Sequence, residues 1–260
     1  MDDDFYGAGD LIDVPDDYYP PTPPPYEEIF TMRSGRAINL RLVGASPTEA
    51  HVLWNGAKVV SDYFEADPGR VAGKTLLELG AASGLPSLVA AILGAARVVM
   101  TDYPDPELVE NMQRNIDACE GVGGTGVVLA RGFIWGGDPA PLRECLVEGQ
   151  EQGQGQEDAR FDVLVLADLL FRHREHPDLV KTIRETLSRK EGSAAYVFFT
   201  SYRPWKKELD MKFFDVARED GFEVEHVLER KLDKPLFEND PGDLDVQKTV
   251  NGFIVRWPAS

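Results

Sequence analysis

Residues 78–84, ELGAASG, place an acidic side chain just before a run of small residues. An apolar stretch precedes this run and another, which opens with Pro86, follows it; this is the pattern of a strand, a tight glycine turn and a helix. Asp102 ends the next apolar stretch, where its carboxylate can accept hydrogen bonds from both hydroxyls of a ribose. These residues predict a nucleoside-containing cofactor, and they leave both NAD and S-adenosylmethionine as candidates.

The spacing of the small residues bears on the choice between these cofactors. The dinucleotide fingerprint places glycine at the first, third and sixth positions of the turn, which here hold Gly80, Ala82 and Leu85. Leu85 is a poor match, because the third glycine lets the helix pack closely on the strand beneath a pyrophosphate. S-adenosylmethionine has no phosphates. It needs a close backbone approach, which residues 80–82 allow, and an anion near its positive charges, for which Glu78 is the candidate.

The elements that must position these residues alternate regularly from residue 74 onward. The segment 161–170 is apolar almost throughout, as a central parallel strand should be. Strands are predicted at 74–79, 97–101, 126–133, 161–170 and 194–201, and helices at 86–93, 106–120, 139–148, 177–190 and 206–221. Such alternation indicates a parallel, doubly wound sheet.

The end of the chain departs from this alternation. Residues 222–230 and 251–257 have the pattern of a sixth and a seventh strand with no helix between them, so the last strand must enter the sheet antiparallel. Five parallel units followed by an inserted antiparallel strand are the topology of class I methyltransferases. We therefore predict an α/β, Rossmann-like doubly wound sheet of seven strands with the last strand antiparallel, which favours S-adenosylmethionine as the cofactor.

Composition excludes several classes of partner. The 260 residues, 43% of them hydrophobic, suffice for one large α/β domain. The net charge of −18 argues against nucleic acid or an anionic membrane and favours a cationic protein or peptide, although acidity can also serve solubility alone. No apolar run is long enough to span a membrane, and the acidic N-terminus is not a targeting peptide. Cys119 and Cys145 lack metal-ligand spacing, so we expect no metal site, and the reducing cytoplasm is their natural compartment. We also expect a monomer.

The first residues of the chain differ in composition from the rest. Residues 1–30 hold nine acids and no Lys or Arg, which is half of the net charge. The segment 14–28 has many prolines and few aliphatic side chains, so we expect it to be extended or disordered. It is either a solvated tail or an acidic arm that reaches the substrate.

Regular structure is expected to begin near residue 37. A half-buried strand is predicted over 37–44 and a helix over 49–67. We therefore divide the chain into a flexible acidic arm, 1–36, and a single S-adenosylmethionine-dependent methyltransferase domain, 37–260.

Four segments resemble one family of proteins over nearly the whole chain from about residue 20. ELGAASGLPSL (78–88), TDYPDPEL (101–108), ADLLFRHREHPDLV (167–180) and RLVGASPTEAHVLWNGA (41–57) are similar to segments of fungal protein methyltransferases. Members act on the N-terminal glycine and the adjacent lysine of translation elongation factor 1-alpha, and were first named as nicotinamide N-methyltransferase-like proteins. The resemblance implies the same S-adenosylmethionine-dependent activity on a basic protein substrate.

Carried over by position, the resemblance implies a set of cofactor contacts from small, acidic and aromatic residues. They are Trp54, Gly80, Ala81, Ala82, Asp102, Trp135 and Ala167. Trp135 follows the third strand, where an indole can stack on adenine, and Ala167 ends the fourth, where a small side chain lets the cofactor approach. Trp54 could wall off the methionine end, although a tryptophan at helical spacing is often a core residue.

Methyl transfer from a sulfonium to an amine needs alignment, exclusion of water and an amine without its proton, and it needs no metal. Asp168 ends the fourth strand and is predicted to hold the incoming amine. Related lysine methyltransferases carry Asp-x-x-Tyr here, whereas Phe171 keeps the aromatic wall and lacks the hydroxyl. His173 and His176 are candidate proton acceptors, or they simply begin the next helix.

The residues leave three other functions open. A small-molecule amine methyltransferase is suggested by the older family name, and a non-catalytic protein could keep the cofactor fold for interaction only. A dehydrogenase is disfavoured by Leu85 and by the two-strand ending.

Overall fold

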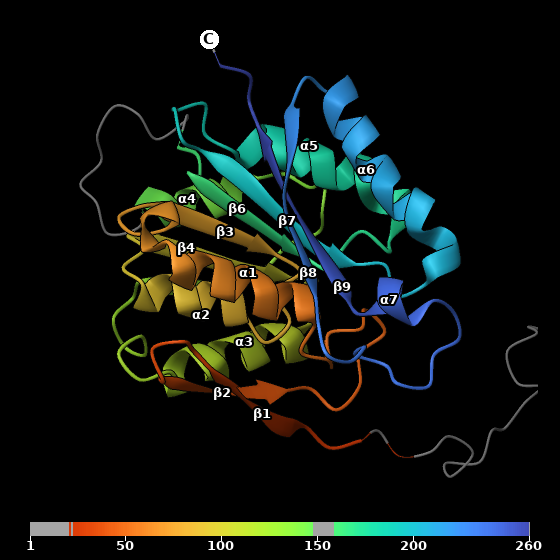
Figure 1. The fold of residues 1–260 in the computed structure, drawn as a ribbon. Helices are drawn as coiled ribbons and strands as arrows, with labels where there is room; N and C mark the ends of the chain where they lie inside the picture. Colours follow the sequence, from red (N-terminus) through yellow and green to blue (C-terminus); the bar gives the residue numbers. More distant parts are fainter. Residues whose placement is uncertain (1–20, 22, 148–158, 260) are drawn as a thin grey trace, which may run out of the picture.

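A computed structural model describes residues 21, 23–147 and 159–259, so the loop expected at 148–158 lies outside the described residues. A seven-stranded sheet with the order β5-β4-β3-β6-β7-β9-β8 runs through the molecule (Figure 1). Its strands are β3 (Thr75–Leu79), β4 (Arg97–Asp102), β5 (Val128–Gly132), β6 (Val163–Ala167), β7 (Ala194–Thr200), β8 (Glu223–Lys231) and β9 (Thr249–Arg256).

The pairing of the strands confirms the predicted fold class. Strands β3 to β7 pair in parallel, and β9 inserts between β7 and β8 antiparallel to both. The connection between β8 and β9 contains only the single turn α7 (Leu244–Gln247), which is too short to carry a crossover. The sequence pattern missed α7, because four residues are too few to display a helical period.

Helices cover both faces of the sheet (Figure 1). One face is covered by α1 (Asn55–Ala66), α2 (Leu85–Ile92) and α3 (Pro106–Ala118), and the other by α4 (Ala140–Val147), α5 (His176–Thr186) and α6 (Lys207–Glu219). All residues of β6 and β7 are buried, as strands covered on both sides must be, whereas the edge strand β8 exposes charged side chains.

The N-terminal part of the described chain corrects one expectation. Strand β1 (Tyr26–Thr31) pairs antiparallel with β2 (Ala37–Leu42), so regular structure begins at Tyr26 and not near residue 37. This hairpin lies against α3, where the side chains of Asn111 and Asn115 both donate to the backbone carbonyl of Arg41 at 2.9 Å (Figure 1). The division into an arm and one domain remains a prediction, since most of the arm lies outside the described residues.

Helix α1 begins later than the sequence pattern predicts. A helix was expected from residue 49, but α1 starts at Asn55 with Trp54 as its N-cap. Glu49 has a φ of 64°, in the left-handed region, which a right-handed helix cannot include. The residues before α1 therefore form an irregular segment that is free to line a cavity.

Helix α2 begins without a side-chain cap of its own, because its N-cap residue is Gly84. The carboxyl group of Glu78, in β3, replaces that cap: it accepts a hydrogen bond from the backbone N–H of Ser87 at 3.0 Å and a second, short one from the Ser87 hydroxyl. Glu78 is buried, and burial raises its pKa to about 8 despite these hydrogen bonds. The group is therefore mostly protonated at neutral pH.

This burial predicts a specific pH dependence of stability. The folded-state pKa of Glu78 lies above the ordinary value of 4.5, so its contribution is fully present below about pH 4.5 and is lost as the pH rises toward 8. We expect Glu78→Gln, which keeps the shape without ionising, to remove a slope of about 1.4 kcal/mol per pH unit from the free energy of unfolding between pH 5 and 8. Urea denaturation at several pH values measures this slope. The exposed Glu219→Gln is the control, and a wild-type slope in Glu78→Gln would contradict the assignment.

Candidate active site

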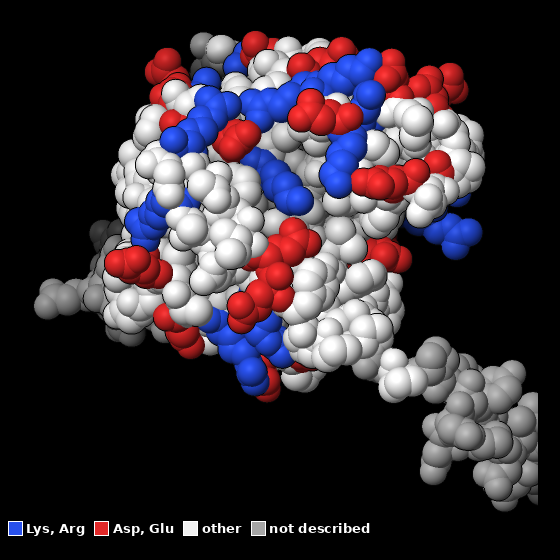
Figure 2. Space-filling model, turned by 60° about the horizontal axis from the view of Figure 1, so that its bottom comes forward, with Lys and Arg blue, Asp and Glu red and all other residues white. Residues whose placement is uncertain are grey.

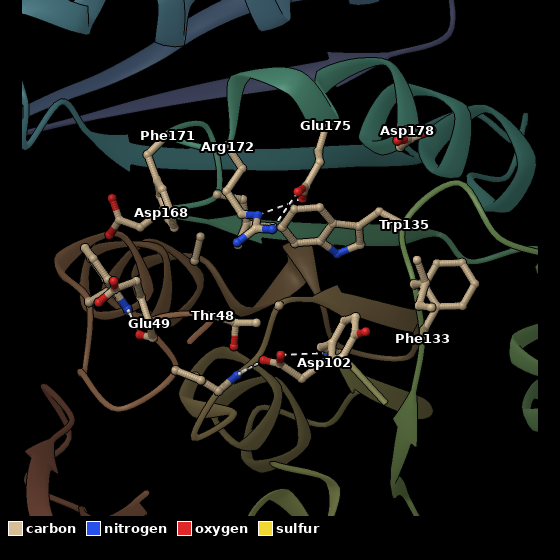
Figure 3. A pocket seen from close by; sticks show the side chains of 18 residues that line it. Thr48, Glu49, Asp102, Phe133, Trp135, Asp168, Phe171, Arg172, Glu175 and Asp178 are labelled. Carbon is tan, nitrogen blue, oxygen red and sulfur yellow. Dashed lines mark hydrogen bonds and ion pairs between the residues drawn. The ribbon is translucent and has the colours of Figure 1, made fainter. Parts of the chain in front are cut away.

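A cavity of about 300 Å³ lies at the carboxyl edge of the parallel strands. It is lined by the turns after β3, β4, β5 and β6 and by the segment that precedes α1. Figure 3 shows Asp168 and Phe171 at one end of the cavity, Trp135 and Phe133 at the other, and Asp102 on the wall between them. The cavity is thus elongated, with a carboxylate at one end and aromatic rings at both.

Most of the predicted site residues meet in this cavity. The lining includes Trp54, Gly80, Ala82, Asp102, Trp135, Ala167, Asp168 and Phe171. Glu78, Ala81 and His173 were also predicted and do not line it. Each of these three residues makes a hydrogen bond away from the cavity.

Glu78 and Ala81 face the protein interior. The Glu78 carboxyl group accepts hydrogen bonds from Ser87 and does not line the cavity, and burial raises its pKa to about 8. The backbone N–H of Ala81 donates to the carbonyl of Thr101 at 2.8 Å, and its side chain belongs to the core. Both residues shape the turn and do not contact the cavity.

The two histidines of the following segment point away from the cavity. His173 lies in the short helix η3 (His173–Glu175), and its Nε2 is 2.7 Å from Oδ1 of Asp210 on α6. His176 donates from Nε2 to the carbonyl of Leu170 at 2.8 Å, and burial lowers its pKa. Neither imidazole lines the cavity, so the structure gives neither the proton-accepting position that the sequence suggested.

Asp102 is held by the turn that the sequence singled out. Its Oδ2 accepts from the N–H of Ala82 at 2.8 Å, its Oδ1 accepts from the N–H of Tyr103 at 2.7 Å, and burial raises its pKa. Each carboxylate oxygen keeps a further lone pair. A Cβ at Gly80 would lie 2.6 Å from a methyl carbon of Leu169 and 3.3 Å from the Trp135 ring, so glycine at this position lets both side chains pack closely against the turn.

Asp168 occupies a more enclosed position. Its Oδ2 accepts from the N–H of Gly56 at 2.5 Å and its Oδ1 from the N–H of Thr200 at 2.7 Å. The N-cap of α1, Trp54, makes no capping hydrogen bond, so Asp168 caps this helix from the end of β6. Burial raises the pKa of Asp168 to about 7, and the hydrogen bonds that it accepts offset only part of that rise.

Backbone strain also concentrates at the cavity. Among the described residues, the non-glycine residues with positive φ are Glu49 at 64°, Ala82 at 50° and Asp168 at 55°, and all three line it. Such conformations persist only where the surrounding structure holds them, and they are common at functional sites. The strain is a second indication, independent of the cavity itself, that this edge of the sheet is functional.

Sequence reasoning missed several residues around the site. Trp54 is stacked on Phe171 at 5.8 Å between centroids, and Tyr202 and Phe237 meet its ring edge-on at 5.1 and 5.7 Å. Tyr202 follows β7 at the ligand-binding edge of the sheet, so its position could have been found by the rule that identified Asp168. Phe237 lies in the β8–β9 connection, and nothing in its sequence context marks it.

Acidic side chains outnumber basic ones in the described lining of the cavity. Arg172 forms a two-pronged ion pair with Glu175 at 2.7 and 2.5 Å, and both line the cavity (Figure 3). Figure 2 shows basic and acidic side chains interspersed on one face of the molecule. In the part of the chain that the structure describes, no group of three or more His, Cys, Asp or Glu side chains could hold a metal ion, and no helix has the length and apolar character of a membrane span.

Comparison with known sequences identifies relatives along nearly the whole chain. A family described as lysine methyltransferase matches residues 44–220. A protein of Gibberella zeae named protein N-terminal and lysine N-methyltransferase EFM7 is 64% identical over 98% of this chain and 96% of its own length. Proteins of the same name in Neurospora crassa and Schizosaccharomyces pombe are 55% and 38% identical, over 96% and 99% of this chain and 89% and 98% of their own lengths.

Solved structures share the fold at low sequence identity. A Streptococcus mutans protein described as a SAM-dependent methyltransferase has a TM-score of 0.59 at 12% identity, over 88% of this chain and 55% of that one. A second solved structure, described as a methyltransferase complexed with SAH, has a TM-score of 0.57 at 12% identity, over 91% of this chain and 56% of that one. These similarities concern the fold alone.

The contact between Asp168 and α1 leads to a test by substitution. A Cβ at Gly56 would lie 2.6 Å from both Asp168 Oδ2 and the carbonyl oxygen of Phe198, so Gly56→Ala must displace the start of the helix. We expect a loss of about 1–3 kcal/mol in the free energy of unfolding, measured by urea denaturation, although alanine is otherwise the better helix residue. Gly69→Ala is the control, because a Cβ there meets only the exposed side chain of Asp67. Equal stability of the two variants would contradict the close approach.

Proposed function

The chain belongs to the lysine methyltransferase family, and from that premise we propose that it methylates the N-terminal α-amine and the adjacent lysine of translation elongation factor 1-alpha. The methyl donor of the family is S-adenosylmethionine. The names of the relatives, with identities up to 64%, support the choice of a terminal amine and a lysine as acceptors. The observation that carries the proposal is a buried carboxylate, Asp168, beside aromatic rings at one end of an elongated cavity.

The residues at the other end fit the nucleoside part of this donor. We assign the ribose hydroxyls to Asp102, whose two oxygens are fixed by backbone N–H groups and keep lone pairs for further donors. We assign adenine to the region of Trp135, whose indole lines this end of the cavity. The bound donor supplies an electrophilic methyl group and a neutral thioether as the leaving group.

The acceptor end is suited to an amine that must lose a proton. The pKa of Asp168 is about 7, whereas an α-ammonium group titrates near 7.7–8.0 and lysine near 10.4. Proton transfer to Asp168 therefore costs about 1 kcal/mol from an α-amine and about 4–5 kcal/mol from lysine, at 1.36 kcal/mol per pKa unit. Asp168 is thus a competent proton acceptor for a protein N-terminus, and a lysine needs additional desolvation.

The location and assembly state belong to the same proposal. A translation factor works in the cytoplasm, so an enzyme that modifies it acts there. We also propose that the enzyme acts as a monomer.

The substrate is tested by incubating the enzyme with labelled S-adenosylmethionine and recombinant elongation factor 1-alpha. We expect methylation of the terminal residue to precede that of the lysine at pH 7, because Asp168 matches the α-amine more closely. Intact-mass and fragment spectra measure the order of the two modifications. Controls are the N-acetylated factor, whose terminus cannot react, and nicotinamide. Labelling of nicotinamide alone would contradict the proposal and restore the small-molecule alternative.

A further inference from the structure

Tyr202 completes a group of aromatic rings around Trp54 and Phe171, which line the acceptor end of the cavity. Tyr202 and Phe237 pack against Trp54 and are not part of the lining. The ring of Tyr202 meets Trp54 at 5.1 Å and 65° and Phe237 at 5.6 Å and 69°, while Phe171 is stacked on Trp54 at 16°. Trp54, Phe171, Tyr202 and Phe237 belong to four chain segments that lie far apart in the sequence. We call these four rings the aromatic wall.

The hydroxyl of Tyr202 is the polar group that the aromatic wall directs at Asp168. It donates to Asp168 Oδ2 at 3.4 Å and accepts from the backbone N–H of Asn55 at 3.3 Å. Burial raises the pKa of Tyr202 well above its ordinary value, so the hydroxyl keeps its proton and remains a donor. Phe171, which is stacked on Trp54, has no hydroxyl to offer.

The backbone of Tyr202 is also fixed in place. The side chain of Gln247, 1% exposed, donates from Nε2 to the carbonyl of Tyr202 at 3.2 Å and to that of Pro241 at 2.9 Å. The β8–β9 connection therefore holds Tyr202 by a hydrogen bond from Gln247 and by the ring of Phe237. A residue held at its ring, hydroxyl and carbonyl has a defined position before any substrate arrives.

From this geometry we infer that Tyr202 is a positioning residue for the acceptor amine. Its hydroxyl orients the Asp168 carboxylate, and its ring closes the aromatic wall beside that carboxylate. Tyr202 thereby supplies, from the end of β7, the hydroxyl that Phe171 lacks. The inference rests on the proposed function, in which Asp168 receives the amine.

Several other groups set the charge around Asp168. Asp210, paired with His173, raises the pKa of Asp168 by its charge, and the cavity wall adds Glu49 and the Arg172–Glu175 ion pair. The hydrogen bond from Tyr202 acts in the opposite direction, because it stabilises the ionised carboxylate. Removal of the hydroxyl should therefore raise the pKa of Asp168 while these other charges stay in place.

Tyr202→Phe tests the inference, because it removes the hydroxyl and keeps the ring. We expect a carbon-detected NMR titration of the Asp168 carboxyl group to show a higher pKa in the variant than in the wild type. We also expect kcat for N-terminal methylation to fall about 10-fold, as for the loss of one hydrogen bond to a charged group, and the acid limb of the pH profile to move to higher pH. The affinity for S-adenosylmethionine, measured by calorimetry, should be unchanged.

Tyr196→Phe is the matched control, since Tyr196 is a buried tyrosine of β7 whose ring packs against Tyr63 and Phe64. An identical Asp168 titration in wild type and Tyr202→Phe would overturn the inference, whatever the activity. An unchanged kcat and pH profile in an active enzyme would overturn it as well. If the titration moves but the wild type methylates no N-terminal acceptor, the hydroxyl–carboxylate contact is supported and the proposed function fails.

Discussion

The Asp168 carboxylate determines how the end of β6 meets α1 and β7. The carboxylate accepts a hydrogen bond from a backbone N–H in the first turn of α1 and another from the N–H of the last residue of β7. The backbone of Asp168 itself lies in the left-handed region. Because Trp54 immediately precedes α1, a shift of this helix would move the aromatic wall as well. One buried group therefore fixes the helix start, the strand end and the acceptor side of the cavity together.

Around the turn after β3, two further buried carboxyl groups accept hydrogen bonds from backbone N–H groups, but they differ in whether they reach the cavity. Glu78 caps α2 from beneath, is fully enclosed and stays mostly protonated, so its contribution is structural. Asp102 and Asp168 also accept backbone N–H groups, but both reach the cavity. Access to the cavity separates the proposed binding carboxylates from the structural one.

The sequence was most informative where function depends on strand ends. Alternating apolar segments predicted the sheet, and the rule that ligands bind beyond the carboxyl ends of strands led to Asp102 and Asp168. Glu78 lies outside the cavity lining, because a motif does not show on which side of a strand a carboxylate lies, and its role toward the cofactor stays a prediction. His173 was misplaced for a similar reason, since it turns toward α6. Phe237 reaches the site through long-range packing, which no local pattern reveals.

The most direct test of the central role of Asp168 is a single-turnover measurement with Asp168→Asn. The variant is loaded with S-adenosylmethionine, its affinity for which is checked by calorimetry, and mixed with elongation factor 1-alpha. We expect the affinity to stay within a few-fold of the wild type and the rate of transfer to the terminal amine to fall about 100-fold or more, within the range attributed to a general base. A transfer rate close to that of the wild type would show that the carboxylate serves only to hold α1, and would contradict its role in receiving the amine.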